Sequence, residues 1–130
     1  MLIEKRINTS NREEIIDITG EVIKEIQSNN IEQGVCVVFV PHTTCAITIN
    51  ESADPDVKRD ILTWMKKQIP RAGDYKHFEG NSDAHLKTML TGQSVQMIIE
   101  NRQLMLGTWQ ALYFCEYDGP RKRKYWIKII

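Results

Sequence analysis

The chain has 130 residues, of which 42% are hydrophobic and 26% charged, and its 17 basic and 17 acidic side chains give a formal net charge of zero. This length fits one compact domain, residues 1–130, and the balanced charge argues against a nucleic-acid-binding protein. No apolar run approaches the roughly 20 residues of a membrane span, and residues 1–6 lack the order of a signal peptide. We therefore expect a cytoplasmic protein without nucleic-acid or membrane partners.

Hydrophobic periodicity predicts the elements of the first half of the chain. Residues 1–8 alternate as a half-buried strand does, and residues 13–28 carry apolar side chains at three- and four-residue spacing, which predicts an amphipathic helix. The continuous apolar run of residues 35–40 predicts a strand buried on both faces. After a break at residues 41–44, residues 45–49 predict a second strand.

Helix signals follow. Asp54 is a favourable N-cap and Pro55 suits the first helical position, so a helix is expected over residues 55–68. Residues 70–81 contain two glycines and no periodicity, which predicts a surface loop. A short helix over residues 83–91 comes next. We expect its apolar side chains to face the core, namely Leu86, Met89 and Leu90.

The last third of the chain is predicted to be β-structure. Strands are expected over residues 94–99, 108–116 and 124–130, separated by turns rich in polar residues, Gly and Pro. Strands and helices without regular alternation predict an α+β domain built on a largely antiparallel sheet.

The three histidines, His42, His77 and His85, all lie at junctions between predicted segments. Three imidazoles that converge with one position left open are the ligand set of a catalytic zinc, which lowers the pKa of its bound water to about 7. The alternative is that they are scattered surface and capping histidines.

Carboxylates and a basic run supply further candidates. Glu51 and Asp54 closely follow the second predicted strand, and carboxylates of this kind act as general bases or Mg²⁺ ligands. Asp54 already has a structural role as a helix cap, so Glu51 is the better candidate base. The run over residues 119–124 is able to hold a phosphate or diphosphate, although such runs are more often solvated turns. The three cysteines form no CxxC pair and are expected to stay reduced.

Several sequence motifs occur together and in order along nearly the whole chain. In this combination they closely resemble the YjbQ-like family, also called the secondary thiamine-phosphate synthase family. The motifs are Pro41-His42-Thr43-Thr44, the run ITINESADPD from Ile47 to Asp56, Tyr75-Lys76-His77, Gly80-Asn81 with Ala84-His85-Leu86, LGTWQ from Leu106 to Gln110, and Asp118-Gly119-Pro120-Arg121.

The resemblance implies a homotrimer of small α+β domains with a polar site that contains the three histidines. It also implies a weak ability in some members to couple a pyrimidine diphosphate and a thiazole phosphate into thiamine phosphate. The implied catalytic residues are Glu51, His42 and Asp54, the metal ligands are His42, His77 and His85, and the ligand-binding residues are Thr43, Thr44, Asn50, Asn81, Gln110 and Arg121.

Two enzymatic hypotheses and one non-enzymatic hypothesis follow. In the first, a divalent metal acts with Arg121 to hold the diphosphate, while Glu51 transfers protons. The metal is zinc, or Mg²⁺ if the substrate is a diphosphate. Neutralising the charge of the leaving group supplies most of the rate enhancement. In the second, the same site hydrolyses an ester or phosphate. In the third, the trimer only binds a phosphorylated metabolite.

Overall fold

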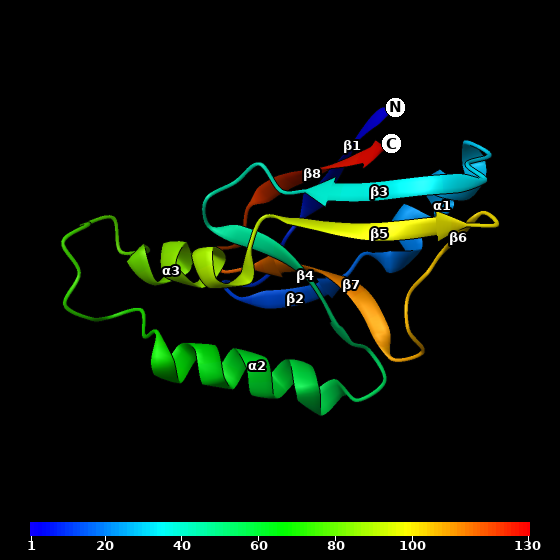
Figure 1. Ribbon diagram of the computed structural model, residues 1–130. Coiled ribbons are helices and arrows are strands. Elements are labelled where there is room, and N and C mark those ends of the chain that lie inside the picture. The colour runs from blue at the N-terminus through cyan, green and yellow to red at the C-terminus, as the bar shows by residue number, and fades with distance from the viewer.

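The computed structural model describes residues 1–130 as three helices and eight strands (Figure 1). In chain order these are β1 (Leu2–Asn8), β2 (Glu14–Asp17), α1 (Thr19–Ser28), β3 (Gln33–Phe39), β4 (Cys45–Glu51), α2 (Pro55–Gln68), α3 (Ser82–Thr91), β5 (Ser94–Glu100), β6 (Gln103–Leu104), β7 (Gln110–Glu116) and β8 (Lys122–Ile129).

The strands form two sheets. The large sheet has the order β1-β8-β3-β5-β6, and the small sheet has the order β2-β7-β4. Every strand pair is antiparallel. The expected α+β domain with a largely antiparallel sheet is therefore confirmed, with two sheets in place of one. None of the three helices is long and apolar enough to cross a membrane.

The main hydrophobic core lies between the two sheets and is closed by α1. Both sheets turn alternate side chains inward, and α1 adds the apolar stripe that its helical spacing predicts. The fully buried side chains of this core include Val22 and Ile26 of α1, Val38 and Ile127 of the large sheet, and Leu112 of the small sheet.

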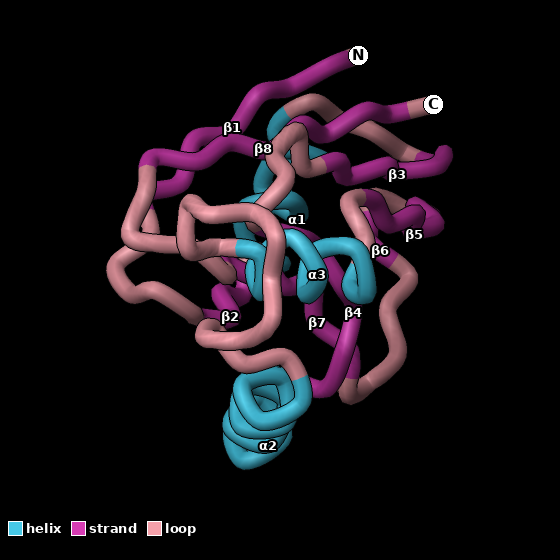
Figure 2. Tube along the Cα trace, turned by 90° about the vertical axis from the view of Figure 1, so that its left-hand side faces the viewer, coloured by secondary structure: helices cyan, strands magenta, loops and turns pink.

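A second, smaller cluster covers the other face of the small sheet. Ala46 of β4, Tyr113 of β7 and Ala84 of α3 are buried there, and α2 adds half-buried side chains such as Ile61 and Met65. The helix α2 itself has no buried residue. Figures 1 and 2 both show α2 set apart from the two sheets, at the bottom of each view.

The helix predicted over residues 13–28 is half wrong, because its first part is the strand β2. Residues Glu14–Asp17 pair with β7, so Ile15 packs on the outer cluster while Ile16 packs against the main core. The helix begins only at Thr19, whose backbone N–H donates to the Asp17 side chain at 2.9 Å. Two adjacent β-branched residues fit a strand as well as a helix, and tertiary pairing decides between them.

Two burial predictions also fail. The β3 run is buried on one face only: Cys36 and Val38 are buried, whereas Phe39 is 41% exposed. On α3 the expected apolar face points outward, with Met89 71% and Leu90 60% exposed. The inward face of α3 consists instead of Asp83, Ala84, Lys87 and Thr88.

Candidate functional site

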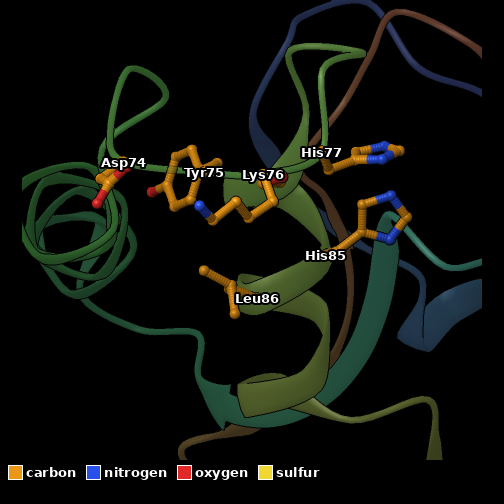
Figure 3. A pocket seen from close by; sticks show the side chains of 7 residues that line it. Asp74, Tyr75, Lys76, His77, His85 and Leu86 are labelled. Carbon is orange, nitrogen blue, oxygen red and sulfur yellow. The ribbon is translucent and has the colours of Figure 1, made fainter.

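Two of the three histidines form a pair at the start of α3. The imidazole ring of His77, from the 69–81 segment, lies edge-on to that of His85, with ring centroids 5.5 Å apart. Both line a cavity of about 490 Å³ together with Tyr75 and Leu86 (Figure 3). That volume falls within the roughly 300–1,000 Å³ of small-molecule sites.

Asn81 fixes the orientation of the His77 ring. The Asn81 side-chain amide donates to Asp118 Oδ2 at 2.9 Å, so its Oδ1 atom faces His77 Nε2 at 3.1 Å as an acceptor. We therefore assign the His77 proton to Nε2, where Glu79 also lies at 3.6 Å. His77 Nδ1 is then an unprotonated lone-pair donor, which is the state that a metal ligand requires.

Asp118 connects the histidine pair to the basic residues around it. Besides Asn81, its carboxylate contacts Arg121 at 3.0 Å and Arg12 at 3.5 Å. Arg12 continues to the buried Asp83 of α3 at 3.1 Å. The predicted residue Arg121 thus contacts the histidine pair only indirectly: its guanidinium binds Asp118, which also binds Asn81, the partner of His77.

The third histidine, His42, lies elsewhere. It lines a separate cavity of about 420 Å³, and its Nε2 accepts the backbone N–H of Lys124 at 3.0 Å. Desolvation, followed by the positive charge of Arg123, lowers the pKa of His42. Within one chain no three His, Cys, Asp or Glu side chains are grouped closely enough to hold a metal ion. The histidine triad that the motifs imply is therefore not assembled by a single chain.

The two threonines after His42 differ in role. Thr43 is exposed, whereas Thr44 is buried and accepts a hydrogen bond from Arg123 at 2.8 Å. Arg123 is paired with the fully buried Glu116 at 2.6 Å. Burial alone would lower the pKa of Arg123, but the hydrogen bonds and charge of Glu116 outweigh it and leave this pKa raised. Thr44 thus belongs to a buried ion-pair network that anchors the 41–44 loop.

The predicted residues Asn50 and Glu51 occupy the opposite end of β4 from the His42 loop. They line a third cavity, of about 230 Å³, between the small sheet and the two helices α2 and α3. Lys58 shares this cavity and lies over the Tyr113 ring at 5.3 Å. Tyr113 in turn donates its hydroxyl to the Glu51 carbonyl at 3.0 Å. Glu51 and the histidine pair therefore line different cavities of the chain.

Two further predicted residues have clear structural roles. Asp54 caps α2 as expected, because its side chain accepts the Asp56 backbone N–H at 2.9 Å. Gln110 accepts the Gly107 backbone N–H at 2.8 Å and pairs with Glu51 across the β7–β4 ladder. The three cysteine thiols are buried, and burial raises the pKa of Cys45 to about 12 and that of Cys36 to about 11, which disfavours the thiolate form.

The sequence analysis did not identify the buried charged residues that hold α3, the helix carrying His85, against the rest of the chain. Lys87 is buried on α3 and bonds both Asp83 at 3.0 Å and Glu13 at 2.7 Å. A signal was present, since Asp83 and Lys87 stand four residues apart on one helix face and form an i,i+4 ion pair. Such pairs are normally solvent-exposed, and only the tertiary structure shows that this one is buried.

Comparison with known proteins places this architecture in a known class. The model of the UPF0047 protein YjbQ-like family matches residues 3–130, and the chain belongs to this family. A UPF0047 protein of Methanocaldococcus jannaschii is 48% identical over 100% of this chain and 94% of its own length. The UPF0047 protein YugU of Bacillus subtilis is 47% identical over 100% of this chain and 99% of its own length.

Solved structures agree. A crystal structure of a YjbQ/UPF0047 family protein from Clostridium acetobutylicum superposes with a TM-score of 0.96 at 57% identity, covering 98% of this chain and 99% of that one. A YbjQ-like protein of unknown function from Sulfolobus solfataricus reaches a TM-score of 0.94 at 31% identity, covering 99% of this chain and 95% of that one. The family resemblance expected from the motifs is confirmed.

Proposed function

We propose that this protein is a metal-dependent enzyme that acts on a small phosphorylated metabolite at the His77–His85 pair. The observation that carries the proposal is the orientation of His77: Asn81, itself anchored by Asp118, accepts from its Nε2 and leaves Nδ1 without a partner beside His85, at a 490 Å³ cavity. An imidazole oriented by a polar partner that is itself anchored by a carboxylate is the support that metal-binding histidines normally have.

The donor set fits a divalent metal in part. Two imidazoles suit zinc, but catalytic zinc sites use three protein ligands, so one ligand must come from elsewhere. His42 is the third ligand in the prediction. Its Nε2 is occupied by the Lys124 N–H, so it would have to bind through Nδ1. A metal ion bound here would supply Lewis acidity and an activated water.

A homotrimer in which neighbouring chains complete the site is part of this proposal. Large apolar side chains are exposed on the segments that carry the histidine pair, with Phe78, next to His77 in sequence, 96% exposed and Met89 on α3 71% exposed. Trp64 on the weakly packed α2 is 55% exposed. We assign these exposed apolar side chains to the contact between chains. A neighbouring chain is also the simplest source of the missing ligand, and it would allow Glu51 to reach a site from which it is remote in its own chain.

The metal test compares matched histidine variants of the purified protein. His85→Ala and His77→Ala are expected to lower the bound zinc per chain at least tenfold after equilibration with the metal, measured by elemental analysis. Asn81→Ala should weaken zinc binding about 10- to 100-fold, the usual cost of losing an outer-shell partner. Unchanged zinc content in both histidine variants would remove the metal from the proposal.

The substrate test separates the three functional hypotheses. Formation of thiamine phosphate from the pyrimidine diphosphate and the thiazole phosphate would support the transferase activity implied by the family name. Release of phosphate or alcohol from a panel of esters, without coupling, would support the hydrolase. Saturable binding of phosphorylated compounds with no turnover at any metal loading would leave a non-catalytic binder and contradict the enzymatic proposal.

A further inference from the structure

The cavity that contains His42 is lined almost wholly by positive and hydrogen-bonding groups. It has a volume of about 420 Å³ and no hydrophobic lining residue. Its walls come from β1, the loop before β4, and β8. The lining residues are Arg6, Asn8, His42, Lys122, Arg123 and Lys124.

Strand alternation makes this cavity more basic than the sequence run suggests. Along β8 the side chain of Arg123 turns inward, where Glu116 neutralises it at 2.6 Å. Lys122 and Lys124 turn outward on either side of it, and register places Lys124 opposite Arg6 of β1. Three cations therefore face the same opening. Two carboxylates lie beside these cations: Glu116, which is paired with Arg123, and Glu4, which lies 3.5 Å from Lys124 and 3.6 Å from Arg6.

His42 adds a directed donor to this opening. Because its Nε2 accepts the backbone N–H of Lys124, the neutral ring carries its proton on Nδ1. The ring is held by main chain, so changes to the lysine side chains leave it in place. A fixed N–H donor beside cationic side chains orients an anionic oxygen, while the cations supply the attraction.

From this geometry we infer that the cavity formed by Arg6, His42, Lys122 and Lys124 is a binding site for a phosphate group. The lysines and Arg6 neutralise the charge of the phosphate, and His42 Nδ1–H donates to one of its oxygens. The inference rests on the proposed function only for the class of ligand, a phosphorylated metabolite. The site requires no metal. Because Nε2 of His42 is already occupied, its Nδ1 either donates to phosphate or binds a metal, so in a chain whose phosphate site is filled the third metal ligand is not this His42.

The test measures phosphate binding to the full-length protein by calorimetry and by amide NMR shifts at constant ionic strength. The Lys122→Gln/Lys124→Gln double variant should raise the Kd for inorganic phosphate at least about tenfold, the loss expected for a charge-assisted hydrogen bond. Lys128→Gln is the matched control, because Lys128 lies on the same strand and face but outside the cavity. Its Kd should stay within about twofold of wild type, since its charge is distant and screened.

A gain of affinity supplies a second arm that misfolding cannot imitate. Glu4→Gln removes the exposed carboxylate beside Lys124 and Arg6 and should lower the Kd for phosphate about two- to threefold at low salt. His42→Gln should raise it, and NMR shifts should centre on Asn8 and residues 122–124. Equal Kd values in the double variant and the Lys128 control, or sulfate binding as tightly as phosphate and pyrophosphate, would overturn the site as a phosphate site.

The two proposals fail separately. The Lys122→Gln/Lys124→Gln variant should retain its zinc, and His85→Ala should retain its phosphate binding. If the double lysine variant loses its zinc, the phosphate site is not separate from the metal site, and the inference is refuted. If the wild-type protein binds no zinc, the proposed metal-dependent enzyme is refuted and the phosphate site stands.

Discussion

At the scale of single residues, the buried ion pair of Arg123 and Glu116 contributes to the stability of the fold beside the His42 cavity. Glu116 is fully buried and also accepts the Thr9 hydroxyl at 2.6 Å. Removing one partner of such a pair leaves an unpaired charge in the interior, which costs about 3–5 kcal/mol. Desolvation would then act on Arg123 without the opposing charge that now raises its pKa.

We therefore expect Glu116→Gln to lower the free energy of unfolding by about 3–5 kcal/mol, measured by urea denaturation. Glu4→Gln serves as the control, because that carboxylate is exposed, and its unfolding midpoint should match wild type. A wild-type midpoint for Glu116→Gln would mean that water or a rearranged side chain reaches Arg123.

Glu51 supports a prediction about chemistry at the same scale. Its backbone carbonyl, not its side chain, accepts the hydrogen bond from Tyr113, so the carboxylate is free to act elsewhere. Glu51→Gln keeps the shape of the side chain and removes the base. We expect the variant to fold, to bind zinc, and to lose about 10²- to 10⁴-fold in kcat on the substrate that wild type turns over. An unchanged kcat would assign Glu51 a structural role.

At the scale of elements, the N-terminus of α2 separates capping from catalysis. Asp54 was predicted both as a cap and as a catalytic residue, and the structure shows the cap. Asn caps a helix as well as Asp, whereas Ala costs about 1 kcal/mol.

Asp54→Ala should therefore speed amide hydrogen exchange in α2 about fivefold, while Asp54→Asn should leave it near the wild-type rate. Activity then decides the second role. If Asp54→Asn retains turnover, the residue acts only as a cap, and if it loses turnover with α2 intact, the carboxylate takes part in the chemistry.

The sequence predicts well those elements whose hydrophobic pattern or capping residues fit only one type of secondary structure. Alternation predicts β1, and a cap followed by Pro predicts the start of α2 to the residue. The strand β2 was hidden because Ile15 and Ile16 fit two periods, and only pairing with β7 settles the choice. The helix α3 was predicted in the right place with the wrong face inward, because its buried ion pair reads as surface charge.

The same limit applies to the candidate site. The sequence identified His77, Asn81 and His85 as residues of one site, and the chain brings them together. It also suggested that His42 joins them, yet the folding of a single chain places His42 beside Lys124. Periodicity places a residue within its own element, whereas distances between elements depend on tertiary packing that no local pattern encodes.

At the scale of the whole molecule, the proposed assembly predicts which surface is buried between chains. Met89 on α3 and Ile98 on β5 are similarly exposed, at 71% and 62%, but only Met89 belongs to the helical layer near the histidine pair. Met89→Glu should shift sedimentation equilibrium from trimer toward monomer, because a charge would be buried in the contact, whereas Ile98→Glu should not.

A concentration-independent monomer for the wild-type protein would contradict the trimer outright. Dissociation caused by Ile98→Glu and not by Met89→Glu would place the contact on the outer face of the large sheet, and would separate it from the histidine pair.

The short turn between β7 and β8 has a consequence for how the two sites communicate. It links the small sheet to the large one, and its Asp118 holds Asn81 and Arg121 beside the histidine pair, while the chain runs directly on into Lys122 and Lys124. If filling one proposed site displaces this turn, the displacement reaches the other proposed site through the chain. Thermodynamic linkage then requires reciprocity: if phosphate changes zinc affinity by some factor, zinc changes phosphate affinity by the same factor.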